Sequence, residues 1–333
     1  MNASDFRTPL TLLTGFLGSG KTSLLQRLLQ EPGMADTAVI INELGEVALD
    51  HLLVDHVAEN LRVLQSGCLC CTVRGDLAQT LADLAARRAA GEIAFSRVVV
   101  ETTGLADPAP VLHTLVADAA VAAAYRLAGV LTTVDAVNAH ATLDHHEEAR
   151  RQAAMADVLL LTKTDLATPA RVDRLADRLV ALNPTAAQFR GLDGARSPRA
   201  LLDAAGDAMA GLHRAERHAA AGSVHHHHDR AIQAHCFGFD EAVSLEAFTH
   251  WLELVAAMRG EKLLRFKGLV HIAEHPGEPL VVHGAQHVIH PPQRLPRWLS
   301  EERHTRLVFI TQGMARAELE RTLRKFAGVT API

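Results

Sequence analysis

The sequence predicts an α/β domain with a mostly parallel sheet, followed by a smaller α+β domain. In the first half, short apolar runs rich in β-branched residues alternate with helical stretches, a pattern typical of a parallel sheet covered by helices. In roughly the last hundred residues, several strand-like runs follow one another with few helices between them. The chain has 333 residues, which is enough for two domains with cores of their own.

The first domain is expected to span residues 1–210. Apolar runs predict strands at 10–14, 38–41, 97–100, 129–134 and 158–161. Helices are expected at 21–30, 76–90 and 169–182. Gly91 would end the second of these helices, and Pro169 would lie in the first turn of the third. This alternation indicates that the motifs described below lie where strands end and helices begin.

The remainder of the chain divides into a linker and a second domain. Residues 211–230 are polar and rich in alanine and histidine, and they predict a flexible linker. Residues 231–333 predict a strand at 232–239, a helix capped by Ser244, strand-like runs at 263–272, 280–289 and 307–311, and a final helix at 315–326. The second domain is therefore expected to be α+β.

Composition and charge exclude several classes of protein. Hydrophobic residues make up 48% of the chain and charged residues 21%, as in ordinary globular proteins. The net charge of −5 gives no basic field that would favour nucleic acid or an anionic membrane. No apolar run is long enough for a spanning helix, and the N-terminus lacks the sections of a secretory signal. We therefore expect a cytoplasmic protein without nucleic-acid or membrane partners.

A phosphate loop is predicted between the first strand and the first helix. Residues 15–22 read GFLGSGKT, which fits the pattern G-x-x-x-x-G-K-[ST] in the required context. Glycines let backbone N–H groups turn toward phosphate oxygens, and Lys21 would reach the β- and γ-phosphates. The Thr22 hydroxyl would ligate Mg²⁺. The expected nucleotide-binding residues of this loop are Gly15, Gly18, Ser19, Gly20, Lys21, Thr22 and Ser23.

A base-recognition motif is predicted after the strand at 158–161. Residues Thr162, Lys163 and Asp165 belong to the sequence TKTD. The Asp165 carboxylate can accept hydrogen bonds from both the N1–H and the exocyclic amine of guanine, which adenine does not offer. The usual guanine motif begins with Asn, so the residues favour GTP while remaining compatible with ATP.

The loop after the strand at 97–100 would complete the nucleotide site. It reads ETTG, and it follows a strand end, where ligands of parallel sheets bind. Glu101 is expected to serve Mg²⁺ from the second shell and to act in catalysis together with Lys21. Gly104 would let the backbone approach the γ-phosphate.

Three cysteines predict a transition-metal site. Cys68, Cys70 and Cys71 lie within four residues, before the helix expected near residue 76. A reducing compartment would not keep them as disulfides, and the helix N-terminus would favour the thiolate form that a metal needs. A site of three thiolates leaves one tetrahedral position open, which suits delivery of a metal better than a structural role.

The segment 42–50 supplies further carboxylates at the end of the second strand. Segments at this place in nucleotide switches sense the γ-phosphate. Glu46 is predicted as a catalytic residue and a transition-metal ligand, and Asp50 as a catalytic residue and a magnesium ligand. The sequence leaves open which of these two carboxylates orients the attacking water.

Histidine is the compositional anomaly, with 20 residues in the chain. His225, His226, His227 and His228 form an internal run in the expected linker. They predict low-affinity metal binding. The competing interpretation is a solvated linker that binds metal only adventitiously.

Taken together, these motifs resemble the CobW family of metal-handling GTPases, within the SIMIBI class of phosphate-loop proteins. The resemblance rests on residues 15–22, 42–50, 67–71, 101–108 (ETTGLADP) and 162–165, and on KLLRFKG at 262–268 for the family's C-terminal domain. It implies GTP hydrolysis with Mg²⁺, coupled to insertion of zinc or cobalt into a client metalloprotein. It also implies a nucleotide-dependent homodimer.

Two residues depart from the pattern, and two other functions stay open. Thr162 replaces the usual Asn, and Ile41 stands where some similar proteins place a carboxylate. A phosphoryl-transfer enzyme such as a kinase would require an acceptor substrate and leave the cysteines structural. A non-enzymatic metal buffer would store zinc without regard to GTP.

Overall fold

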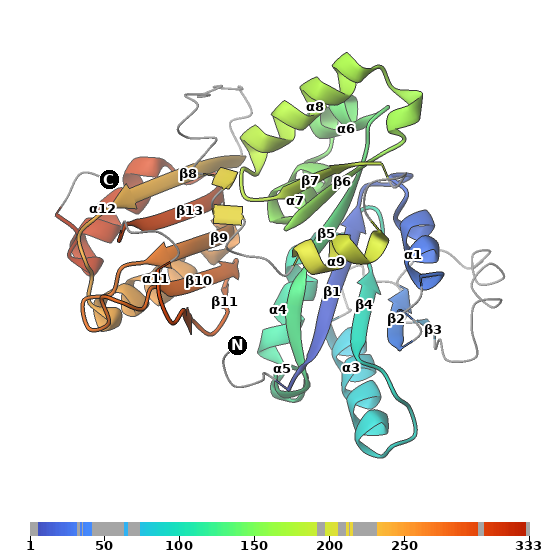
Figure 1. Ribbon diagram of the computed structural model, residues 1–333, viewed down its shortest axis with the longest axis horizontal. Helices are drawn as coiled ribbons and strands as arrows, with labels where there is room; N and C mark the ends of the chain where they lie inside the picture. The colour runs from blue at the N-terminus through green and yellow to red at the C-terminus, as the bar shows by residue number, and fades with distance from the viewer. Residues whose placement is uncertain are drawn as a thin grey trace. The chain divides into compact units, whose positions relative to one another are not determined.

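The computed structural model describes residues 6–31, 34, 36–41, 63–65, 74–191, 197–205, 211–212, 214–215, 232–298 and 303–330, with the backbone alone at 63–65, 74–76 and 116. The chain divides into two compact units (Figure 1). The first contains residues 1–176 and 187–206, and the second contains residues 177–186 and 207–333. Among the helices within these ranges, none has both the length and the apolar character needed to cross a membrane.

The first unit is built on a parallel sheet, as the sequence predicts. Its seven described strands pair in the order β3-β2-β4-β1-β5-β6-β7, and every pairing is parallel. Their bounds are β1 Thr8–Gly15, β2 Thr37–Ile41, β3 Val63–Gln65, β4 Arg97–Glu101, β5 Tyr125–Asp135, β6 Val158–Thr162 and β7 Ala187–Arg190. The central strands are apolar runs because helices cover both faces of the sheet.

Two groups of helices cover this sheet. On one face, α1 (Lys21–Leu29) and α9 (Pro198–Ala205) share an apolar cluster with strand residues such as Leu13 and Leu131. On the other, α3, α4 and α5 contact one another, and α7 contacts α4, α6, β1 and β5. Their bounds are α3 Arg74–Ala89, α4 Pro108–Ala117, α5 Ala119–Ala124, α6 Ala139–His145 and α7 Glu147–Met155, followed by the short helix η1 Thr164–Leu166 and by α8 Pro169–Leu182.

The second unit carries an antiparallel sheet with helices packed against it, which confirms the predicted α+β class. Its strand order is β11-β10-β9-β13-β8, with β12 paired to β10. The elements are β8 Ile232–Phe239, α11 Leu245–Arg259, η2 Gly260–Lys262, β9 Leu263–Val270, β10 Leu280–Ala285, β11 Val288–Ile289, β12 Gln293–Arg294, β13 Thr305–Gln312 and α12 Arg316–Ala327. The core is aromatic, with Phe248, Trp251 and Phe309 buried between helices and sheet.

Two details of the second unit differ from the sequence-based expectations. The run at 280–289 is a tight hairpin of β10 and β11 rather than one strand, and Gln286 turns it with a φ of 53°. Ser244 holds the N-cap position of α11 without a capping hydrogen bond from its side chain. Instead, the Glu274 carboxylate accepts from the Leu245 N–H at 2.9 Å. The hydrogen-bond acceptor at the start of α11 therefore comes from Glu274 and not from Ser244.

The beginning of the expected linker also differs. Leu212 and Ala215 are helical and buried, and they pack against Leu269, Val281 and Val308 of the antiparallel sheet. These two apolar residues therefore cover the face of the sheet opposite to α11 and α12. Residues 216–230, including the histidine run, lie outside the described part of the chain.

Candidate nucleotide and metal site

The phosphate loop leaves the end of the central strand in a tightly confined conformation. Gly15 has a φ of 142°, and a Cβ there would lie 2.4 Å from Thr133 Oγ1 on β5. Gly18 and Gly20 are left-handed, with φ of 69° and 93°. The Ser19 hydroxyl is 2.7 Å from that of Thr133, which ties the loop to β5. Glycine is required at these positions because L side chains rarely adopt these angles.

Lys21 lies inside the loop that it is predicted to serve. It begins α1 and is 9% exposed. Its Nζ donates to the Gly15 carbonyl at 2.9 Å and to the Phe16 carbonyl at 3.3 Å. The ammonium charge is therefore held within the turn where phosphate oxygens would bind.

Thr22 and Glu101 meet at the carboxyl edge of the sheet. The Thr22 hydroxyl donates to Glu101 Oε1 at 2.9 Å, although 79 residues separate them in the chain. Glu101 ends β4, is 1% exposed and pairs in register with Leu13 of β1. A hydroxyl and a carboxylate form the oxygen donor set that Mg²⁺ prefers, so these residues fit the predicted magnesium site.

The loop that follows Glu101 packs directly on the phosphate loop. Thr102 Oγ1 donates to Thr14 Oγ1 at 2.8 Å, and its backbone N–H donates to the Leu13 carbonyl. A Cβ on Gly104 would lie 2.7 Å from the backbone nitrogen of Leu17. Gly104 is needed here because of a contact with the phosphate loop itself, which the sequence did not reveal.

The base motif is joined to the same loop. The Thr162 hydroxyl donates to the Ser19 carbonyl at 2.8 Å. Lys163 adopts a left-handed φ of 54°, and its Nζ is 2.8 Å from Asp135 Oδ2 at the end of β5. Asp165 lies in η1 with its side chain exposed. The motif thus leaves the carboxylate of Asp165 accessible while Thr162 and Lys163 anchor the backbone.

The charge of Asp135 is stabilised in this arrangement. Burial opposes ionisation, but hydrogen bonds from Lys163, from Asn138 and from the Val137 N–H outweigh it and lower the pKa of Asp135. Asp135 is thus a negatively charged partner that orients Lys163. The sequence analysis did not predict Asp135 as a site residue. It directly follows the apolar run 129–134, and this position at a strand end is a signal that could have identified it.

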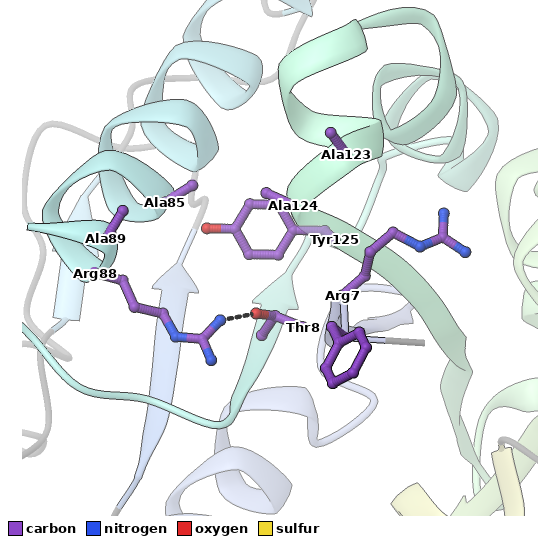
Figure 2. Close-up of a pocket in the computed structure, with 9 residues that line it drawn as sticks. Arg7, Thr8, Ala85, Arg88, Ala89, Ala123, Ala124 and Tyr125 are labelled. Atoms are coloured by element: carbon purple, nitrogen blue, oxygen red, sulfur yellow. Dashed lines mark hydrogen bonds between the residues drawn. The ribbon is translucent and has the colours of Figure 1, made fainter. Parts of the chain in front are cut away.

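Two cavities border the first unit's sheet at opposite ends. One, of about 230 Å³, lies between the phosphate loop, the end of β5, α6 and α7, and its lining includes Phe16, Asp135 and Gln152. The other, of about 640 Å³, lies at the amino ends of β1 and β5. There Arg88 donates to the Thr8 hydroxyl beside the ring of Tyr125 (Figure 2). Burial raises the pKa of Tyr125 to about 12, against the effect of the Arg88 charge.

Several predicted residues cannot be placed. Three groups of predicted site residues lie outside the described residues: the carboxylates Glu46 and Asp50, the cysteines Cys68, Cys70 and Cys71, and the histidines His225, His226, His227 and His228. Within the described ranges, no group of three or more His, Cys, Asp or Glu side chains is arranged to hold a metal ion. The remaining cysteine, Cys236 on β8, is free, and burial raises the pKa of its thiol. The predicted cysteine site thus stays a prediction from the sequence.

The family models match both units of the chain. The model described as CobW/HypB/UreG, nucleotide-binding domain, matches residues 9–190. The model described as cobalamin synthesis protein cobW C-terminal domain matches residues 232–327. The chain belongs to the CobW/HypB/UreG family. The resemblance predicted from the motifs is thereby confirmed.

Relatives within this CobW family extend over nearly the whole chain. The zinc chaperone YjiA of Escherichia coli (strain K12) is 33% identical over 304 residues, covering 90% of this chain and 92% of the relative. The zinc chaperone CobW of Pseudomonas aeruginosa is 30% identical over 367 residues, covering 96% and 91%. The crystal structure of Zn(II)-bound YjiA GTPase from E. coli matches with a TM-score of 0.73 and 27% identity, covering 96% and 99%. This CobW-family chain therefore shares both domains with relatives named as zinc chaperones.

Proposed function

We propose that this protein is a GTP-hydrolysing metallochaperone that binds zinc, or alternatively cobalt, and transfers it to a client metalloprotein. The observation that carries the proposal is the match over 90% of the chain to a relative named as a zinc chaperone, rather than to a nucleotide-binding domain alone. The phosphate loop, the Thr22–Glu101 contact and the Asp165 motif support the nucleotide half of the function.

In this proposal the phosphate loop and Lys21 bind the phosphates of GTP. Lys21 exchanges its bonds to the Gly15 and Phe16 carbonyls for bonds to phosphate oxygens. Thr22 and Asp50 would hold Mg²⁺, with Glu101 in the second shell, and the ion would neutralise charge on the transferred phosphoryl group. Glu46 and Asp50 are the candidates for orienting the attacking water. Asp165 selects guanine, while Thr162 and Lys163 fix the loop that presents it.

Zinc is the cargo of the proposed cycle. Cys68, Cys70 and Cys71 bind it as thiolates, with Glu46 as a further ligand. The described start of α3 at Arg74 lies three residues beyond Cys71, and positive potential at a helix N-terminus favours thiolates. Further ions bind at low affinity to the histidine run His225, His226, His227 and His228. Thiolate ligands also suit cobalt(II), so the identity of the metal depends on its availability.

Nucleotide and metal are coupled in this proposal. Bound GTP orders the segment 42–50 and tightens the cysteine site, and hydrolysis loosens it. Coupling of about 1–3 kcal/mol is typical of such systems and changes affinity roughly 5- to 150-fold. The client receives the metal in the cytoplasm, and the GTP-bound state forms a homodimer.

The proposal is tested by measuring zinc affinity with a competing chelator, using a variant that lacks residues 225–228. Affinity is compared with Mg²⁺-GTPγS, with Mg²⁺-GDP and without nucleotide. We expect tighter binding with GTPγS, and we expect the double variant Cys68→Ser, Cys70→Ser to lose it while still binding GTP. Cys236→Ser is the matched control, because its partly buried thiol lies on β8 in the second unit.

Either of two results would contradict the proposal. Equal zinc affinity in all three nucleotide states would favour a metal buffer. Tight zinc retained by the double cysteine variant would remove the cysteines from the site. The same titration with Co²⁺ shows which of the two metals binds more tightly. Adding candidate acceptor hydroxyl compounds to a GTP turnover assay then tests the kinase alternative.

A further inference from the structure

Helix α7 contacts both loops that surround the predicted γ-phosphate position. At its amino end, the ring of His146 lies 4.5 Å from the ring of Phe16 in the phosphate loop. In its last turns, Arg151 pairs with Asp107 at 3.0 Å, and Gln152 binds the loop after β4. The helix therefore bridges two segments that are far apart in the sequence but converge on the nucleotide site.

Gln152 makes the central contact of this bridge. Its side-chain Nε2 donates to the Gly104 carbonyl at 3.1 Å and to the Ala106 carbonyl at 3.0 Å. Both acceptors are carbonyls, so only the amide nitrogen can face them, and the orientation of the carboxamide is determined. Gln152 is 1% exposed, and its backbone carbonyl accepts from Thr132 Oγ1 at 3.0 Å. The donor is thus held in place by β5.

The loop that Gln152 binds leaves little room for movement toward the phosphate loop. A Cβ on Gly104 would already lie 2.7 Å from the Leu17 backbone nitrogen. Leu17 therefore limits the loop on one side, and the two hydrogen bonds from Gln152 limit it on the other. At the far end of the loop, Asp107 accepts from the Ala109 N–H as the N-cap of α4 while it pairs with Arg151. Contacts within the protein therefore hold the Gly104–Asp107 backbone at both of its ends.

We propose that Gln152 is a positioning residue for γ-phosphate recognition: it holds the backbone at Gly104 and Ala106 against the phosphate loop. This inference rests on the proposed function, in which Gly104 approaches the γ-phosphate of GTP. A loop that is already ordered loses less conformational entropy when the γ-phosphate arrives. GDP lacks that phosphate, so its affinity does not depend on Gln152. In this role Gln152 acts through the backbone of the loop.

The test compares GTPγS and GDP affinities in the full chain with Mg²⁺. Gln152→Met keeps the length of the side chain and removes both hydrogen-bond donors. We expect the ratio of GTPγS to GDP affinity to fall about tenfold, equivalent to about 1.4 kcal/mol, with GDP affinity near wild type. Gln188→Met is the matched control, because Gln188 on β7 also donates to a backbone carbonyl, that of Ala176 on α8.

A second variant keeps the proposal testable if Gln152→Met does not fold. Arg151→Met removes the ion pair to Asp107 on the same loop and should lower the ratio in the same direction, by less. Arg150→Met is its control, since Arg150 precedes Arg151 on the same helix and donates to the Leu143 and Asp144 carbonyls of α6.

The outcomes separate this inference from the proposed function. If the wild-type protein binds GTPγS and GDP equally, γ-phosphate recognition itself fails. If the wild type discriminates and Gln152→Met discriminates to the same degree or more, the positioning role is wrong. An equal loss of both affinities would also overturn it, because that result indicates a merely structural residue.

Discussion

The hydroxyl of Thr162 donates a hydrogen bond to the backbone carbonyl of Ser19, with 2.8 Å between the two oxygens. This contact joins the base motif to the phosphate loop across 143 residues of sequence. It also gives a physical reason for threonine at the first position of the motif, where the usual residue is Asn. The residue that departs from the usual motif thus connects the base motif to the phosphate loop.

Removing the Thr162 hydroxyl should weaken this connection. Thr162→Val keeps the shape of the side chain and leaves the Ser19 carbonyl without its donor. We expect a loss of about 1–2 kcal/mol in the free energy of unfolding of the first unit, and weaker GTP binding. Urea unfolding and nucleotide titration measure the two effects. Thr162→Ser retains the hydroxyl and should behave like wild type; equal losses in both variants would show that the methyl group matters instead.

Changing Asp165 should alter the choice of base. In the proposed function the native carboxylate accepts from both guanine donors, whereas the amide in Asp165→Asn presents one acceptor and one donor, which matches xanthine. The variant should therefore lower GTP affinity by at least about 100-fold and raise XTP affinity. Competition against a fluorescent GDP analogue measures both. Asp173→Asn, at an exposed carboxylate paired with Arg190, is the control. Unchanged preference in Asp165→Asn would remove this residue from the base site.

Adding a methyl group at Gly104 should displace the loop after β4. The Cβ would lie 2.7 Å from the Leu17 nitrogen, and backbone atoms move less easily than a flexible side chain. Gly104→Ala is expected to reduce GTP turnover on the order of 100-fold, because small misplacements of reacting groups have large effects. Phosphate release measures turnover. Gly277→Ala is the control, since a Cβ there meets open space. Wild-type turnover in Gly104→Ala would mean that the loop adapts freely.

The stability of the second unit should fall in mild acid because of His235. Burial lowers the pKa of His235 below its ordinary value of 6.5, and the charge of Arg316 acts in the same direction, against the hydrogen bond to the Met314 carbonyl. Below pH 6.5 the unfolded chain binds a proton that the folded unit resists, so stability decreases as pH falls toward the folded pKa. The slope is at most about 1.4 kcal/mol per pH unit.

Urea midpoints of the second unit at about pH 7.5 and about pH 5.5, on either side of the ordinary histidine pKa, measure this effect. In His235→Gln the pH dependence should be smaller, because the side chain no longer titrates. His250→Gln, an exposed position on α11, should keep the wild-type dependence. If the two variants lose stability alike in acid, another group controls the transition.

Most of the parallel sheet was predictable because its strands are distinct apolar runs. The runs at 10–14, 38–41, 97–100, 129–134 and 158–161 all lie in observed strands. The start of β5 at Tyr125 was missed because Ala-rich helical sequence precedes it. The hairpin of β10 and β11 was missed because Gln286 and His287 carry no glycine, proline or asparagine signal, yet Gln286 still adopts a left-handed φ.

The site was predictable only where one segment carries its own motif. The phosphate loop, Glu101 and Asp165 follow from local patterns at strand ends. Gln152 and Asp135 do not, because their importance arises from contacts with Gly104 and Lys163 that the sequence separates by 48 and 28 residues. A glutamine in the middle of a helix has no local signal that it binds a distant loop.

The central place of β1 has a consequence for synthesis of the chain. β1 carries the phosphate loop, and its partners are β4 at residues 97–101 and β5 at residues 125–135. While the ribosome is still making the residues before β4, β1 has no neighbour on either side, and non-local pairings of this kind form late. The cysteines at 68–71 thus leave the ribosome before the strand that supports the phosphate loop is paired. We expect nascent chains that end before β5 is complete to present these thiols before the phosphate loop is able to bind a nucleotide.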